Sequence, residues 1–141
     1  MIIIIPLGGI GSRFEEKGYR KPKALINLFG KPILYYLLDS LNIKDIDFIC
    51  IPYNTEYHNY NFEAQLTKDY PNLKFKFIHL ITDTEGAAET INIALKTFNC
   101  DDKPILCLDG DNFYTMDIVS LWKGENKITS VRLNSLICVE K

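Results

Sequence analysis

The sequence predicts an α/β fold in which a mainly parallel sheet is flanked by helices. Short apolar runs recur along the chain, and segments of helical character lie between successive runs. Strands that alternate with helices at this spacing form parallel sheets with right-handed crossovers. The chain has 141 residues, which suits one domain with its own hydrophobic core. We therefore expect a single domain over residues 1–141.

The strands are predicted from apolar runs of strand length. Met1–Ile5 is continuously apolar and β-branched, as in a strand that is buried inside a parallel sheet. Further strands are expected at Phe48–Pro52, Leu73–Leu80 and Pro104–Leu108, and a strand-like stretch at Ile128–Leu133.

The helices are predicted in the segments between these strands. Pro32–Leu41 is apolar on most faces and has proline in its first turn, which favours a largely buried helix. Asn54–Tyr70 is polar and compatible with a helix. After Gly86, apolar residues at helical spacing predict an amphipathic helix through Ile91, Ala94, Leu95 and Phe98.

The composition is that of a soluble globular protein, with 47% hydrophobic and 24% charged residues and a net charge of −2. This charge does not favour broad nucleic-acid binding. We expect no signal peptide and no membrane span, because the start of the chain lacks a basic leader and no apolar run is long enough. Without C-x-x-C or metal-type spacing, the cysteines are expected to be reduced, as in a cytoplasmic protein: Cys50, Cys100, Cys107 and Cys138.

A glycine-rich turn follows the first predicted strand, with glycine at Gly8, Gly9 and Gly11. Glycine brings bare backbone N–H groups close to a ligand. Cations crowd the segment that follows: Arg13, Lys17, Arg20, Lys21, Lys23 and Lys31. This pattern predicts a polyphosphate site. Neither common phosphate motif fits, because Phe14 stands at the last glycine of G-x-G-x-x-G and Pro32 follows the only Gly-Lys pair.

Three linked pieces of this segment resemble the signature of the sugar-phosphate nucleotidylyltransferase superfamily. They are Gly8-Gly9-Ile10-Gly11-Ser12-Arg13-Phe14, then Pro22-Lys23, then Gly30-Lys31-Pro32. The resemblance covers roughly residues 1–115, the nucleotide-binding half of the family's Rossmann-like fold. It implies a mixed, mainly parallel sheet of the nucleotide-diphospho-sugar transferase type, with residues 116–141 as a shortened C-terminal part.

The resemblance also implies a role for two later stretches. Gly86-Ala87-Ala88 is similar to the small-residue segment that opens a helix beside the nucleotide base and ribose. Asp109-Gly110-Asp111-Asn112-Phe113 resembles the strand-end segment whose aspartate holds the catalytic magnesium, which implies Asp111. Asp109 is a second carboxylate that binds metal, orients a water or caps the turn.

The resemblance implies a role for each matching residue. Arg13 and Lys23 are the expected catalytic residues, as a clamp on the triphosphate and a cation at the α-phosphate. Mg²⁺, with Mn²⁺ as a substitute, is the expected cofactor at Asp111. The expected nucleotide-binding residues are Leu7, Gly8, Gly9, Gly11, Ser12, Arg13, Glu85, Gly86, Ala87 and Asp109.

The implied reaction transfers a nucleoside monophosphate from CTP, UTP, GTP or dTTP to a phosphorylated acceptor, with release of pyrophosphate. The Ser12-Arg13-Phe14 variant and the stretch from Asp109 are most similar to the branch of bacterial capsule and surface-polysaccharide pathways. That branch includes sugar-phosphate enzymes and a cytidylyltransferase that acts on phosphoglutamine. Because half of such a sheet exposes apolar surface and an open edge, we also expect self-association into a homo-oligomer.

Two alternatives remain open. A metal-dependent glycosyltransferase also uses an Asp-x-Asp motif but does not call for the glycine signature and Pro22-Lys23. A truncated, non-catalytic nucleotide-binding module is favoured only by the chain length. His58 and His79 lack an obvious acidic or cysteine partner and are expected to be structural or surface residues.

Overall fold

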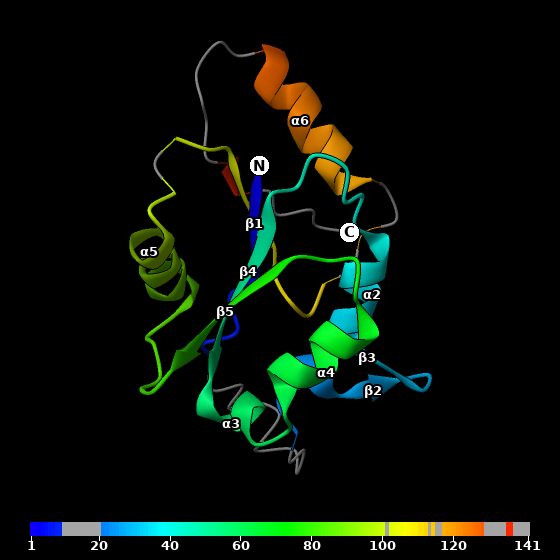
Figure 1. Cartoon of the computed structure of the whole chain (residues 1–141), viewed down its shortest axis with the longest axis vertical. Helices are drawn as coiled ribbons and strands as arrows, with labels where there is room; N and C mark the ends of the chain where they lie inside the picture. Colours follow the sequence, from blue (N-terminus) through cyan, green and yellow to red (C-terminus); the bar gives the residue numbers. More distant parts are fainter. Residues whose placement is uncertain (10–20, 101, 113, 115–116, 129–134, 137–141) are drawn as a thin grey trace.

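The computed structural model describes residues 1–9, 21–100, 102–112, 114, 117–128 and 135–136. Its main sheet has five parallel strands in the order β5-β4-β1-β6-β7 (Figure 1). The strands are β1 (Ile2–Ile4), β4 (Phe48–Asn54), β5 (Phe75–Leu80), β6 (Ile105–Cys107) and β7 (Ser135–Leu136). The predicted α/β fold with a mainly parallel sheet is confirmed.

Strand β1 lies at the centre of the sheet. Ile3 pairs with Ile49 of β4 on one side and with Leu106 of β6 on the other. Ile2 is 2% exposed and Ile3, Ile4 and Ile5 are fully buried. Both faces of the strand are therefore covered, which explains why its sequence is continuously apolar instead of alternating.

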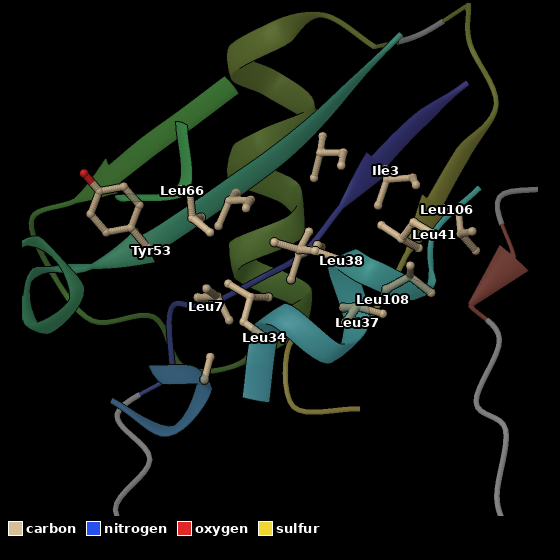
Figure 2. Close-up of a cluster of buried hydrophobic side chains, with 14 of the residues drawn as sticks. Ile3, Leu7, Leu34, Leu37, Leu38, Leu41, Tyr53, Leu66, Leu106 and Leu108 are labelled. Carbon is tan, nitrogen blue, oxygen red and sulfur yellow. The ribbon is translucent and has the colours of Figure 1, made fainter. Parts of the chain in front are cut away.

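Helices cover both faces of the sheet. On one face, Ile2 and Ile4 pack with Ala94 of α5 (Ala87–Phe98). On the other face, Ile3 belongs to a larger cluster with side chains of α2 (Ile33–Ser40), α4 (Phe62–Asp69) and α6 (Ile118–Ile128). Figure 2 shows part of this cluster, with Leu34, Leu37 and Leu38 of α2 facing the strands. The sheet is thus the middle layer of three.

A small antiparallel hairpin lies between the first strand and α2. It consists of β2 (Asn27–Leu28) and β3 (Lys31–Pro32), and a single 3-10 turn, η1 (Lys23–Leu25), precedes it. Phe29 and Gly30 have positive φ angles of 52° and 80° and form the tip. Pro32 caps the start of α2, so the predicted helix at Pro32–Leu41 is confirmed within one residue at each end.

Two local predictions differ from the structure. The helix-compatible stretch 54–70 is split into α3 (Thr55–His58) and α4, because Asn61 adopts a left-handed conformation with φ 51° between them. Ile128 ends helix α6 instead of starting a strand, and residues 129–133 of that predicted strand lie outside the described residues. Helix α6 itself was not predicted.

The structure also bears on the cysteines and on membrane insertion. Cys50 and Cys107 lie in β4 and β6 as predicted, and both are free thiols, as is Cys100. Burial raises the pKa of the Cys50 thiol to about 12 and that of Cys107 to about 11. Cys138 lies outside the described residues. Among the described helices, none is long and apolar enough to cross a bilayer.

Candidate functional site

A cleft of about 180 Å³ opens where β1, β4 and β6 end. The carboxyl ends of parallel strands meet at one edge of a sheet, and the loops that leave them form ligand sites. The segment after β1, the turn η1, helix α3 and the loop after β6 all contribute to the cleft. Its lining residues are Pro6, Leu7, Gly9, Pro22, Lys23, Ala24, Glu56, Tyr57, Asp109, Gly110 and Asp111.

Gly8 and Gly9 occupy opposite environments in the glycine turn. Gly8 is buried, and a Cβ atom there would lie 2.5 Å from Thr90 Oγ1 and 2.7 Å from Thr84 Oγ1. These two buried hydroxyls are hydrogen-bonded to each other at 2.6 Å. Gly9 is exposed, lines the cleft and has no atom within 4 Å of an ideal Cβ. Gly8 therefore serves packing, while Gly9 leaves its backbone open to a ligand.

Asn54 holds the glycine turn after β1 in place. It is the last residue of β4 and is 1% exposed. Its Nδ2 donates to the Gly9 carbonyl at 3.0 Å, and its Oδ1 accepts from the Glu56 N–H at 3.1 Å. The second bond caps the start of α3, whose Tyr57 lines the cleft. Sequence reasoning missed Asn54, although an asparagine between a buried strand and a Thr-Glu pair is a typical N-cap signal.

Lys23 and Asp111 face each other across the cleft. The Lys23 ammonium forms an ion pair with Asp111 Oδ2, and the two side chains are 39% and 32% exposed. The turn that carries Lys23 is anchored because the Ala24 N–H donates to the Tyr57 hydroxyl at 3.4 Å. Burial raises the pKa of Tyr57, so this phenol stays uncharged beside the pair. The pair thus places a cation and an anion within reach of a ligand, and Glu56 and Asp109 add two more carboxylates to the lining of the cleft.

The loop after β6 is held against the first strand by Gly110. A Cβ at this position would lie 2.5 Å from Leu7 Cδ2 and 3.3 Å from Ile5 Cγ2. Glycine therefore lets this loop approach β1 closely, which places both Asp109 and Asp111 in the cleft. Asp109 Oδ2 lies 3.5 Å from Asn112 Nδ2, and the Asn112 N–H donates to the Asp109 carbonyl at 3.3 Å. Asp109 therefore also contacts the turn that it begins.

The donor set of the cleft fits a magnesium ion that is shared with phosphates. Mg²⁺ is usually held by one or two protein carboxylates together with substrate oxygens and water. Asp109 and Asp111 supply two carboxylates, and the described part of the chain contains no group of three acidic, histidine or cysteine ligands. Such a site would need ligand oxygens to complete it.

The structure brings together only part of the predicted site. Leu7, Gly9, Lys23, Asp109 and Asp111 line one cleft. Glu85, Gly86 and Ala87 are exposed at the start of α5 and do not line it, although Thr84 and Thr90 connect their segment to the back of Gly8. The predicted residues that lie outside the described residues are Gly11, Ser12 and Arg13.

The two histidines lie away from the cleft. His58 stacks on His79 with ring centroids 4.5 Å apart, and His79 stacks on Tyr53 at 5.4 Å. His79 Nε2 also lies 3.2 Å from Thr55 Oγ1. These contacts join α3 to β4 and β5, in line with the expected structural role.

Comparison with known proteins identifies a family and individual relatives of this chain. A family model described as "Nucleotidyl transferase" matches residues 2–137. The bifunctional protein GlmU of Campylobacter hominis is 30% identical over 129 residues, which cover 89% of this chain and 27% of that protein. A glucose-1-phosphate cytidylyltransferase of Salmonella typhimurium is 38% identical over 50 residues, or 35% of this chain and 20% of that protein.

Solved structures share the fold. HddC from Yersinia pseudotuberculosis superposes with a TM-score of 0.69 and 25% identity, over 88% of this chain and 53% of that one. A putative glucose-1-phosphate thymidylyltransferase from Bacillus anthracis gives a TM-score of 0.72 with 20% identity, over 90% and 51%. The chain therefore spans about half the length of these structures and about a quarter of GlmU.

Proposed function

Because this chain belongs to the nucleotidyl transferase family, we propose that it binds a nucleoside triphosphate in the cleft and transfers the nucleotidyl group to a phosphorylated acceptor. One observation carries the proposal: Lys23 and Asp111, far apart in the sequence, face each other beside the open backbone of Gly9. A cation, a carboxylate and bare backbone groups are what a metal-bound polyphosphate requires.

The reaction needs no protein nucleophile. A phosphate oxygen of the acceptor attacks the α-phosphorus, the bond from that phosphorus to the bridging oxygen breaks, and pyrophosphate leaves with the electron pair. The protein has to bring two polyanions together and offset the charge that develops on the phosphate oxygens. Lys23, which lines the cleft, would perform the second task. Arg13, which lies outside the described residues, remains the predicted clamp on the triphosphate.

Asp111 would hold Mg²⁺ or Mn²⁺, and Asp109 is near enough in the same cleft to assist directly or through water. When bound, the ion would neutralise charge on the phosphate oxygens. Because the Lys23 ammonium pairs with Asp111, Lys23 and a bound metal ion would compete for that carboxylate. A bound triphosphate would relieve this competition, since it would offer Lys23 another anion.

For the acceptor we propose a sugar phosphate or a similar small metabolite such as phosphoglutamine, in the synthesis of a capsule or surface polysaccharide. The Ser12-Arg13-Phe14 signature supports this branch, as does the stretch that begins at Asp109. The Salmonella relative carries the name of a glucose-1-phosphate cytidylyltransferase, which supports a sugar phosphate. The base is one of cytosine, uracil, guanine and thymine.

The test measures pyrophosphate release by the full chain with CTP, UTP, GTP and dTTP across a panel of phosphorylated acceptors. We expect release with one nucleotide and one acceptor class, and a loss of about 10²–10³-fold in rate for Lys23→Ala and for Asp111→Ala. The matched controls are Lys103→Ala and Asp47→Ala, which break a partly exposed ion pair outside the cleft.

Three other outcomes would contradict the proposal. Normal rates in both cleft variants would show that the site is misplaced. Sugar transfer from a sugar nucleotide would favour the glycosyltransferase alternative. Tight Mg²⁺-dependent nucleotide binding with no turnover on any acceptor would favour the non-catalytic module.

A further inference from the structure

A second cavity lies on the other side of the segment that carries Lys23. Its volume is about 310 Å³, compared with about 180 Å³ for the cleft described above. It opens between the base of the β2–β3 hairpin and helix α4, and none of its lining residues lines the cleft. This size falls at the lower end of the range of pockets that enclose small molecules.

The interior of the second cavity is apolar and aromatic. Its apolar and aromatic lining consists of Leu25 of η1, Pro32 of β3, Tyr35 of α2, and Phe62 and Leu66 of α4. Tyr60 lies in the loop before α4 and keeps 40% of its surface exposed. When an apolar ring displaces water from such a lining, apolar surface is buried and the free energy falls, which favours binding.

The rim of the second cavity carries positive charge. Lys21 lines it, together with the amide side chains of Asn27 and Gln65, and the described lining contains no carboxylate. Asp69 does not line the cavity, but its carboxylate accepts a hydrogen bond from the hydroxyl of Tyr35, which does, and lies 3.4 Å from Gln65 Nε2. The negative group of a ligand would therefore lie near Lys21 and away from Tyr35. A ring with one negative group therefore fits the cavity, with the ring inside and the charge near Lys21.

Two short segments connect the second cavity to the cleft. In the first, Lys21 and Leu25 line the cavity while Lys23 lines the cleft. The turn between them is closed by a hydrogen bond from the Leu25 N–H to the Pro22 carbonyl at 2.9 Å. Because the turn is this short, a shift of Leu25 has to move Lys23.

The second connection runs through the end of α3. Tyr57 lines the cleft and Tyr60 lines the second cavity, and the Tyr60 N–H donates to the Tyr57 carbonyl at 3.1 Å. Tyr57 in turn accepts a hydrogen bond from the Ala24 N–H. The two connections thus meet at η1, the turn that positions Lys23.

We propose that this second cavity is an effector site for a small anion with a flat apolar ring, such as an aryl sulfonate, carboxylate or phosphate, and that its occupation shifts Lys23 and changes nucleotide affinity. The second half of this inference depends on the proposed function, while the first half does not. Coupling of this kind is reciprocal, so bound nucleotide must change the affinity for the anion by the same factor.

The binding test uses naphthalene-2-sulfonate as the probe, followed by calorimetry or ligand-observed NMR on the full chain. We expect saturable binding with a Kd below about 1 mM. Gln65→Trp, at an exposed position of α4, fills the cavity and should abolish binding. Lys68→Trp is the matched control, because Lys68 is exposed on the same helix but does not line the cavity. Lys21→Gln keeps the hollow and should weaken binding several-fold.

The coupling test compares the affinity for a Mg²⁺–nucleoside triphosphate with and without saturating probe. We expect a change of about fivefold or more in the native chain, and none in Gln65→Trp. Absence of probe binding, or equal probe binding in Gln65→Trp and Lys68→Trp, would overturn the site. Probe binding that leaves nucleotide affinity unchanged would overturn the coupling. If no nucleotide binds at all, the proposed function fails while the probe result still decides the site.

Discussion

Gly8 and Gly9 are neighbours that need glycine for different reasons. A methyl group at Gly8 would overlap the Thr84 and Thr90 hydroxyls, whereas one at Gly9 would meet nothing. We predict that Gly8→Ala lowers the free energy of unfolding by about 1–3 kcal/mol. Gly9→Ala should change it by about 0.5 kcal/mol or less but weaken nucleotide binding. Urea unfolding and nucleotide titration of both variants measure this, and equal stability of the two would refute the distinction.

The ion pair between Lys23 and Asp111 has a second measurable consequence, because Asp111 is the carboxylate that would hold the metal. We predict that Lys23→Ala binds Mn²⁺ more tightly than the native chain when no nucleotide is present. A partly exposed ion pair is worth up to about 1 kcal/mol, or about fivefold in affinity. Electron paramagnetic resonance of free Mn²⁺ gives both affinities, and Lys103→Ala, which breaks an ion pair outside the cleft, serves as the control. Weaker or unchanged binding in Lys23→Ala would show that Asp111 is not the metal ligand.

At the scale of residues, the charged groups of the cleft were named from the sequence, but the residues that support the glycine turn were missed. Lys23 and Asp111 were predicted from the family resemblance, through Pro22-Lys23 and the strand-end segment that begins at Asp109. Both line one cleft, and their roles stay predictions. The N-cap role of Asn54 has a sequence signal, but its hydrogen bond to the Gly9 carbonyl has none. The Thr84–Thr90 hydrogen bond behind Gly8 has none either, because both contacts depend on the tertiary fold.

Asn54 connects two elements, since it bonds both the glycine turn after β1 and the start of α3. Asn54→Ser keeps a good N-cap for α3 but is too short to reach Gly9. We predict that this variant unfolds at nearly the native temperature and binds nucleotide about fivefold more weakly, the effect of one lost hydrogen bond. Asn54→Ala should also be less stable, because the Glu56 N–H loses its partner. If Asn54→Ser binds nucleotide with native affinity, the hydrogen bond from Asn54 to Gly9 does not contribute to nucleotide binding.

Asp117 caps helix α6. Its Oδ1 accepts from the Ser120 N–H at 3.1 Å, and its Oδ2 accepts from the Ser120 hydroxyl at 2.6 Å and from Asn42 Nδ2 at 3.1 Å. These bonds, chiefly those from Ser120, lower the pKa of the Asp117 carboxyl. We predict that Asp117→Ala costs about 1 kcal/mol at neutral pH, while Asp117→Asn, also a good cap, costs less.

The pH dependence of this cap follows from the sign of the shift. A carboxyl with a lowered pKa in the folded state stabilises the protein above its unfolded pKa of about 4. That contribution is lost as the pH falls through the folded pKa. The stability difference between the native chain and Asp117→Asn should therefore shrink below about pH 4. A difference that stays constant in urea unfolding from neutral to acidic pH would contradict this role of the carboxylate.

At the scale of elements, segments with a strong hydrophobic pattern were predicted correctly, whereas a helix break caused by a single residue was not. β1 and α2 could be predicted because a continuous apolar run and a proline-led apolar segment each favour one structure. The break at Asn61 could not, because the composition of 54–70 is compatible with a helix throughout and one left-handed residue interrupts it. Helix α6 was missed because its sequence carries Gly124 and has the β-branched residues Ile118 and Val119 at its start and Ile128 at its end, which favour a strand.

At the scale of the whole molecule, the strand order β5-β4-β1-β6-β7 gives the cleft its place. The order in which strands are added to the sheet reverses at β1: β4 and then β5 lie on one side of it and β6 on the other. Ligands of open α/β sheets bind at such a reversal of strand order. The sequence predicted a parallel sheet but not this order, because crossover helices do not reveal on which side the next strand pairs. The expected self-association stays a prediction. The chain spans about half of the solved structures that it matches.

The most direct test of the central claim is a crystal structure of the full chain with Mg²⁺ and a non-hydrolysable nucleoside triphosphate. The account predicts phosphates in the cleft between Gly9 and Asp111, the Lys23 ammonium moved from Asp111 onto a phosphate oxygen, and the metal on Asp111. A nucleotide or metal bound elsewhere, or Arg13 and Asp111 pointing away from a common cleft, would contradict it.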